Sequence, residues 1–168
     1  MNKIFTFIDR VTPKNNLLKL FVISFYTISL TFTFNIAITK IVGIDINFDP
    51  TSTIKKIQEN IYLYFLTLVI ITPLIETTIF QWLPLKLYKH FQKTKKYEYI
   101  FLLITGLIFG IVHSYSVGYQ IALTFTGLIL MILSMYYSEN NKNYFFPIYL
   151  IHLLNNLIVF FIQVDNFK

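Results

Sequence analysis

The stretch TPLIETTIFQWLP, residues 72–84, decides the fold of this chain because it places Glu76 inside an apolar run that begins at Ile61. A charged side chain near the middle of a membrane helix costs roughly 3 kcal/mol, so such groups are few, face the bundle interior and serve a function. The other apolar runs contribute two imidazoles, His113 and His152. One acid and two imidazoles therefore stand where little else ionises.

Composition indicates a single-domain integral membrane protein. The chain has 168 residues, of which 55% are hydrophobic and 13% charged, and its mean hydropathy is +0.61, far from a soluble average. The lack of cysteine excludes disulfides, thiolate zinc sites and a cysteine nucleophile. The net charge of +6 comes from lysines beside apolar runs, which favours contact with the lipid bilayer over nucleic acid.

The apolar runs predict an all-α fold, a polytopic transmembrane helix bundle of about five spans in the cell membrane. A run of about 20 residues is long enough to cross a bilayer. The first run follows a basic segment, as in a signal peptide, but it is long and no small-x-small cleavage site follows, so we predict a retained span. The five predicted spans cover residues 17–39, 61–83, 99–115, 119–137 and 145–163.

Prolines and basic residues refine this topology. Pro73 should bend the second span one turn before Glu76, and Pro84 should close it. Residues 85–98 mix five lysines with apolar side chains, which is typical of a short amphipathic helix lying on an anionic leaflet. With the N-terminus inside, ten Lys and Arg residues fall on the cytoplasmic side and four outside, so the positive-inside rule predicts that orientation.

The spans divide the chain into three predicted parts. Residues 1–59 hold the N-terminal tail, the first span and an outer connection, residues 60–163 form a four-helix catalytic core, and residues 164–168 are a short tail. All three ionisable groups lie in the core. If helices two, three and five pack together, these groups share one hydrated pocket.

The spacing of polar residues in the core indicates hydrolytic chemistry. Residues four apart lie on one helix face, so Phe109 accompanies His113 and Asn156 accompanies His152. A carboxylate such as Glu76 can take a proton from water while histidine and asparagine hold the developing oxyanion. Simpler interpretations remain open: Glu76 as a protonated interhelical hydrogen-bonding group, His113 as an interfacial histidine, and Asn156 as a packing contact.

These residues resemble the CPBP group of intramembrane endopeptidases, which includes type II CAAX prenyl proteases and Abi-type bacteriocin self-immunity proteins. The family motifs are Glu-Glu-x-x-x-Arg, Phe-x-x-x-His and His-x-x-x-Asn on core helices. The chain matches them with Glu76, with Phe109 to His113 and with His152 to Asn156, in that order. The resemblance implies that Glu76 activates water and that His113, His152 and Asn156 are the other catalytic residues.

The first motif departs from the family at two positions. Thr77 stands where the second glutamate is expected, and Gln81 stands where the arginine is expected, with Phe80 beside it. An ion pair across one helical turn is thus replaced by a neutral pair that can still hydrogen-bond, and no unpaired buried charge is left behind. We expect Thr77, Phe80, Gln81 and Phe109 to support the site.

The resemblance leaves the role of metal open, because family members have been described as metalloproteases and as glutamic proteases. Glu76, His113 and His152 would be the ligands if zinc is used, with water in the fourth position. No further acid is available to orient either histidine, so we favour water activation without a cofactor.

Three functions are compatible with the sequence. The first is an intramembrane peptidase that cleaves a membrane-embedded or membrane-delivered peptide or protein, in bacteriocin self-immunity or peptide maturation. The second is a non-catalytic immunity or scaffold protein of the same fold, which the Thr77 and Gln81 departures favour. The third is a proton-coupled carrier subunit, which five spans without an inverted repeat make the weakest of the three.

Overall fold

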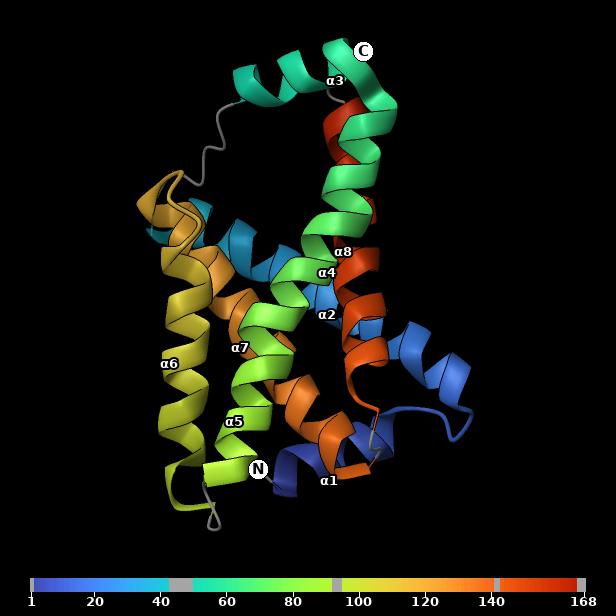
Figure 1. The fold of residues 1–168 in the computed structure, drawn as a ribbon, viewed down its shortest axis with the longest axis vertical. Coiled ribbons are helices and arrows are strands. Elements are labelled where there is room, and N and C mark those ends of the chain that lie inside the picture. The colour runs from blue at the N-terminus through green and yellow to red at the C-terminus, as the bar shows by residue number, and fades with distance from the viewer. Residues whose placement is uncertain (1, 43–49, 92–94, 141–142, 166–168) are drawn as a thin grey trace.

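The computed structural model describes residues 2–42, 50–91, 95–140 and 143–165, and within these ranges the chain is helical and has no strand. The predicted all-α bundle is confirmed (Figure 1). The elements are α1 (Asn2–Val11), α2 (Asn16–Ala37), η1 (Ile38–Val42), α3 (Pro50–Phe65), η2 (Leu66–Ile71), α4 (Thr72–Glu76), η3 (Thr77–Trp82), α5 (Leu83–Phe91), η4 (Lys95–Tyr97), α6 (Glu98–Ile111), α7 (Val117–Asn140) and α8 (Phe145–Asp165).

Helices occur at all five predicted spans, but one of them is short. Four described helices are long and apolar enough to cross a membrane, namely Leu18–Lys40, Gln58–Phe91, Val117–Glu139 and Phe145–Asp165. The predicted third span, 99–115, is the 14-residue helix α6, which rises about 21 Å at ~1.5 Å per residue, against a hydrocarbon core of about 30 Å. It ends early because residues 112–116 turn back, with the Tyr115 amide donating to the His113 carbonyl at 3.0 Å.

The second span begins at Asn60 and runs much further than predicted. Asn60 has non-helical backbone angles, φ −164° and ψ 99°, and its Oδ1 accepts the Leu63 amide at 3.0 Å, which is the geometry of an N-cap. From there the helix continues to Phe91. The predictions that Pro84 closes the span and that 85–98 forms a separate surface helix are therefore wrong for α5.

The helix passes through both prolines because a π-helical segment precedes each of them. Proline lacks an amide donor and its ring clashes with the preceding turn of an α-helix. Just before Pro73, the Thr72 amide donates five residues back, to the Thr67 carbonyl. Before Pro84, the Leu83 amide donates to the Thr78 carbonyl in the same way. The wider turns make room for the rings, and the run from α3 to α5 follows a curved course (Figure 1).

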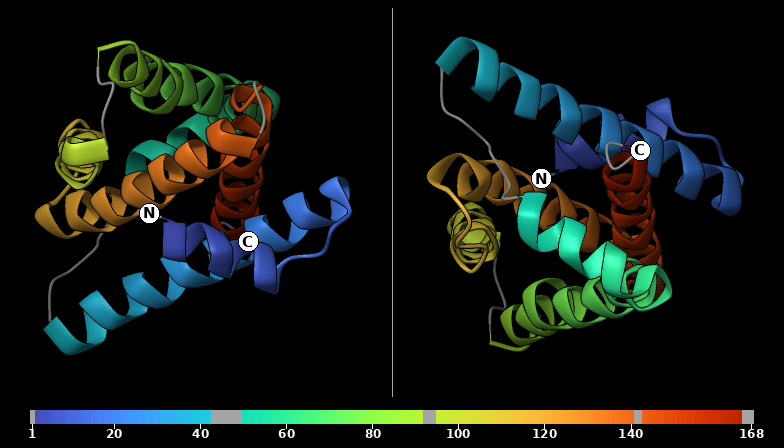
Figure 2. Two further views of the ribbon diagram at one scale, coloured as in Figure 1. Left: turned by 90° about the horizontal axis from the view of Figure 1, so that it is seen from below. Right: turned by 90° about the horizontal axis from the view of Figure 1, so that it is seen from above.

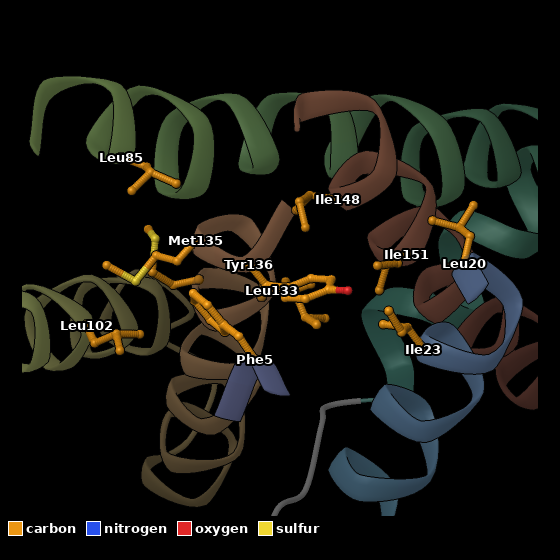
Figure 3. Close-up of a cluster of buried hydrophobic side chains, with 12 residues drawn as sticks. Phe5, Leu20, Ile23, Leu85, Leu102, Leu133, Met135, Tyr136, Ile148 and Ile151 are labelled. Carbon is orange, nitrogen blue, oxygen red and sulfur yellow. The ribbon is translucent and has the colours of Figure 1, made fainter. Parts of the chain in front are cut away.

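Helices α7 and α8 hold the bundle together. Figure 2 shows α8 between α2 and the run from α3 to α5, while α7 crosses the bundle beside α6. The hydrophobic core gathers around the second half of α7 (Figure 3). Its buried members on α7 are Leu130, Met131, Leu133, Met135 and Tyr136, and they pack with residues from α1, α2, α5, α6 and α8.

The pair Gly106 and Gly110 lies where α6 approaches α7. A Cβ on Gly110 would stand 2.4 Å from the Gln120 carbonyl oxygen of α7. Gly127 of α7 in turn leaves room for Phe109, whose Cβ would lie 2.7 Å from an added methyl group. Close packing of the two helices therefore sets the position of the end of α6, where His113 follows.

Asp9 fastens α1 to the bundle, and we predict that this attachment weakens in acid. The Asp9 carboxylate accepts Lys19 Nζ at 2.7 Å and the Tyr136 hydroxyl; the Lys19 bond and then the Tyr136 bond hold the pKa of Asp9 below its usual range. Ionised Asp9 therefore stabilises the attachment of α1 at any pH above the ordinary pKa of aspartate. This stabilisation is lost as the pH falls through the lowered pKa of Asp9. A nitroxide at Phe7→Cys should stay immobile at pH 7 and gain mobility in strong acid, whereas Asp9→Asn should free it at pH 7. Equal mobility of both proteins at pH 7 would contradict this role.

Candidate active site

The structure brings Glu76, His113 and His152 together from three elements. Glu76 Oε1 lies 3.2 Å from His113 Nε2, and Glu76 Oε2 lies 3.2 Å from His152 Nε2. Glu76 ends α4, His113 follows α6 and His152 is buried on α8. The carboxylate is thus bridged by two imidazoles, as the predicted convergence of the second, third and fifth helices requires.

The extension of the second span to Phe91 explains how His113 reaches the same depth as Glu76. Counting from the ends that adjoin each other in sequence, Glu76 lies 15 residues before Phe91 (91 − 76) and His113 lies 15 residues after Glu98 (113 − 98). At ~1.5 Å per residue both are about 22 Å from those ends. A span that ended at Pro84 would have left the two groups at different levels.

The outer nitrogens of both imidazoles have partners, and these determine which protons the rings can carry. His113 Nδ1 lies 2.6 Å from the Phe109 carbonyl oxygen, which only accepts, so this nitrogen carries a hydrogen. His113 Nε2 can then donate to the Glu76 carboxylate only when the ring is the doubly protonated imidazolium. His152 Nδ1 lies 3.3 Å from Thr77 Oγ1, and a hydroxyl can donate. His152 can therefore accept from Thr77 at Nδ1 and donate from Nε2 to the Glu76 carboxylate.

Phe109 forms an apolar wall of the site, and Phe80 packs against Phe109. The Phe109 ring packs against His113 with centroids 4.9 Å apart and against His152 at 6.0 Å. Phe80 meets Phe109 edge to face at 5.5 Å. Phe109 therefore restricts the ring orientations of both histidines, and Phe80 contacts the site through Phe109. That these two residues support catalysis stays a prediction.

Thr77 and Gln81 lie in the interior, but they do not form the expected pair with each other. Thr77 is 0% exposed and Gln81 1%. Thr77 points its hydroxyl at His152, and Gln81 Oε1 has no hydrogen-bond partner among the described residues. Gln81 Oε1 therefore does not bond to Thr77 across this helical turn, because the Thr77 hydroxyl is directed at His152 of α8.

Asn156 has a structural contact that its motif position alone does not reveal. Its Nδ2 donates to the Leu68 carbonyl at 3.0 Å. In a π-helical segment this carbonyl would bond to the amide five residues on, and that residue is Pro73, which has no amide hydrogen. Asn156 thus replaces the donor that proline removes just before Glu76, and the amide keeps a second hydrogen that this contact does not use.

A cavity of about 790 Å³ contains the site. Glu76, Phe109, His113, His152 and Asn156 line it together with residues of the first span. The residues from α2 were missed by the sequence reasoning, and they are Ile28, Thr31, Phe32 and Asn35. Two polar residues four apart in an apolar run, as at 31 and 35, are the signal that could have found this wall.

Further cavity residues come from the ends of helices beyond the motifs. Tyr119 of α7 lines the cavity, and its ring centroid lies 6.4 Å from that of His113. Tyr64 donates to Gln163 Oε1 at 2.5 Å, and both residues also line it. Their spacing in sequence carries no motif, so only the fold identifies them.

Within the described part of the chain, no group of three or more His, Cys, Asp and Glu side chains is arranged to hold a metal ion. In this structure the Nε2 atoms of both histidines are directed to the Glu76 oxygens. The arrangement positions a carboxylate against two hydrogen-bond donors, with room beside it for water and a peptide.

Comparison with known proteins identifies the family. The family model for Type II CAAX prenyl endopeptidase Rce1-like proteins matches residues 58–158, more than half of the chain, and this range contains all three motifs. The search of curated proteins and the search of solved structures each found no match. The chain belongs to the type II CAAX prenyl endopeptidase Rce1-like family, in the CPBP group, and has the fold of an intramembrane protease of the CAAX type.

Proposed function

We propose that this protein hydrolyses peptide bonds within the membrane, with Glu76 as the general base. One observation carries the proposal: both oxygens of a single carboxylate lie 3.2 Å from imidazole nitrogens inside a cavity large enough for a peptide segment. Donors on both sides hold the carboxylate in one orientation, which is what proton transfer from a bound water requires.

The reaction needs no covalent intermediate. Glu76 takes a proton from water, and the resulting hydroxide attacks the scissile carbonyl carbon. The oxyanion that forms accepts hydrogen bonds from imidazole N–H groups and from the second amide hydrogen of Asn156. When the C–N bond breaks, Glu76 passes its proton to the leaving nitrogen, so that the enzyme returns to its starting state.

The proposal includes water activation without a bound metal, for which the arrangement of Glu76 between two histidines is the support. The test is cleavage of membrane-associated peptides by the full-length protein in proteoliposomes, with products identified by mass spectrometry. We expect cleavage that persists after treatment with EDTA and 1,10-phenanthroline. Loss of cleavage with chelator and recovery with Zn²⁺ would show that a metal is required and would contradict this part of the proposal.

A non-catalytic immunity or scaffold role is the second candidate, favoured by the neutral residues Thr77 and Gln81. It makes an opposite prediction in cells. If the protein protects against a bacteriocin by binding alone, protection survives replacement of Glu76 by Gln, whereas a peptidase loses it. Parent and variant compared at equal membrane levels separate the two candidates.

Thr77 is expected to position His152, and we predict that Thr77→Val lowers kcat about fivefold with little change in KM. Valine fills similar volume but leaves His152 Nδ1 without its hydroxyl partner, and a hydrogen bond worth about 1 kcal/mol corresponds to roughly that factor. Thr77→Ser should retain most activity. Steady-state kinetics measures the change, and ¹⁵N spectra of labelled histidine report the tautomer of His152.

The matched control for this change is Thr78→Val. Thr78 is the next residue, and its hydroxyl donates within the helix to the Leu74 carbonyl at 2.7 Å, away from both histidines. We expect Thr78→Val to keep the parental kcat. Equal kcat for the parent and Thr77→Val would remove Thr77 from the mechanism while leaving the role of Glu76 intact.

A further inference from the structure

Helix α1 has three distinct strips along its length. At about 100° per residue, Phe5 and Ile8 point toward the bundle, where Phe5 is 6% exposed. A second strip holds Ile4, Phe7 and Val11, which are 40%, 62% and 40% exposed. A third, polar strip next to Phe7 holds the exposed side chains of Lys3 and Arg10, which lie about 20° apart because they are seven residues apart.

Contacts to α2 and α7 prevent α1 from rotating to bury the second strip. Phe5 meets Tyr136 edge to face, with ring centroids 5.5 Å apart. One turn further along the same side of the helix, the Asp9 carboxylate is held by Lys19 at 2.7 Å and by the Tyr136 hydroxyl. The exposure of Ile4, Phe7 and Val11 is therefore a property of the assembled fold.

The exposed strip lies close to the lipid-facing surface of the bundle. Only residues 12–15 separate α1 from α2, and α2 begins the candidate membrane span Leu18–Lys40. At its start, Leu18 and Phe21 are each 53% exposed. In Figure 1, α1 lies at one end of the bundle near the ends of α5 and α7. A helix placed there, with an apolar strip beside a basic strip, has the pattern of a helix in the membrane interface.

We infer that α1 is an interfacial helix that binds anionic lipid headgroups through Lys3 and Arg10 and inserts Phe7 and its neighbours at the acyl boundary. The charge of the exposed strip matches this occupant, because Asp9, the acid of the helix, is engaged by Lys19. Each basic residue at the membrane surface raises the affinity of a protein for anionic lipids about fivefold.

The first arm of the experiment measures depth. Tryptophan is placed at Phe7→Trp or at Thr6→Trp in a Trp82→Phe background, because Trp82 is the single tryptophan of the chain. Both positions are exposed, but they differ by about 100° around the helix. In full-length protein reconstituted with brominated phosphatidylcholine, we expect strong quenching at 7 and weak quenching at 6. Equal quenching at both positions would overturn the insertion.

The second arm measures headgroup selectivity by native mass spectrometry from nanodiscs of mixed phosphatidylglycerol and phosphatidylcholine. Lys3→Gln/Arg10→Gln should lower the preference for phosphatidylglycerol about 25-fold if each charge gives about fivefold. The control Lys40→Gln/Lys55→Gln removes the same charge from exposed positions elsewhere and should change this preference much less. The headgroup assignment would be overturned if Lys3→Gln/Arg10→Gln kept the parental preference for phosphatidylglycerol. It would also be overturned if the control lost as much of this preference as Lys3→Gln/Arg10→Gln.

Discussion

Glu76→Gln is expected to lower peptide hydrolysis by about 10²- to 10⁴-fold, the usual contribution of a general base. The carboxamide keeps the shape of the side chain but cannot take a proton from water. Because Glu76 is the one carboxylate bonded to both His113 and His152 in the described structure, the change removes the proton acceptor that lies between the two imidazoles. Steady-state cleavage of the best peptide in proteoliposomes measures the loss, which should fall on kcat.

A second buried glutamate supplies the control for that experiment. Glu98, at the start of α6, is 7% exposed and is not among the residues that line the cavity. Glu98→Gln should therefore keep the parental kcat. Gel filtration and thermal melting should show that Glu76→Gln remains folded. Parental cleavage by folded Glu76→Gln would place the base elsewhere and end the assignment of Glu76.

Gly110→Ala should be strongly destabilising, because α6 and α7 are in backbone contact at this glycine. An added Cβ would lie 2.0 Å from Thr124 Oγ1, 2.4 Å from the Gln120 carbonyl oxygen and 2.9 Å from the Thr124 amide nitrogen. Backbone atoms cannot move aside as a side chain can, so the helices must separate. Overpacking costs about 1–3 kcal/mol, and we expect the upper end, a fall in Tm of about 6–12 °C for a chain of this size.

Gly106→Ala is the matched comparison, one turn earlier on α6. There the nearest atoms belong to the Leu128 side chain, at 2.6 Å, and the nearest backbone atom of α7, the Thr124 carbonyl oxygen, is 3.2 Å away. Since leucine can change rotamer, a smaller loss of stability is expected. Gly110→Ala should also lower activity, because His113 follows three residues later. Equal melting temperatures for the two variants would show that the approach of α6 to α7 is looser than the structure indicates.

Sequence alone determined the class of this protein and the residues of its candidate site. Apolar runs of about 20 residues identify membrane helices because the bilayer sets a length that each helix must satisfy by itself. The same local logic singled out Glu76, His113 and His152, since ionisable side chains inside such runs are costly. Spacings of four residues placed Phe109 beside His113 and Asn156 beside His152. Each of these inferences depends on one segment at a time.

Tertiary structure decided how those segments are joined and which partners their polar atoms find. Two contacts depend on how α8 packs against the second span. Thr77 bonds to His152, and Asn156 donates to the Leu68 carbonyl, for which Pro73 has no amide hydrogen. That span continues through Pro84 because of π-helical segments that the sequence pattern did not predict. The longer span places Glu76 at the same depth as His113. The wall supplied by α2 likewise arises from packing between segments distant in sequence, where contacts depend on the whole bundle and not on local periodicity.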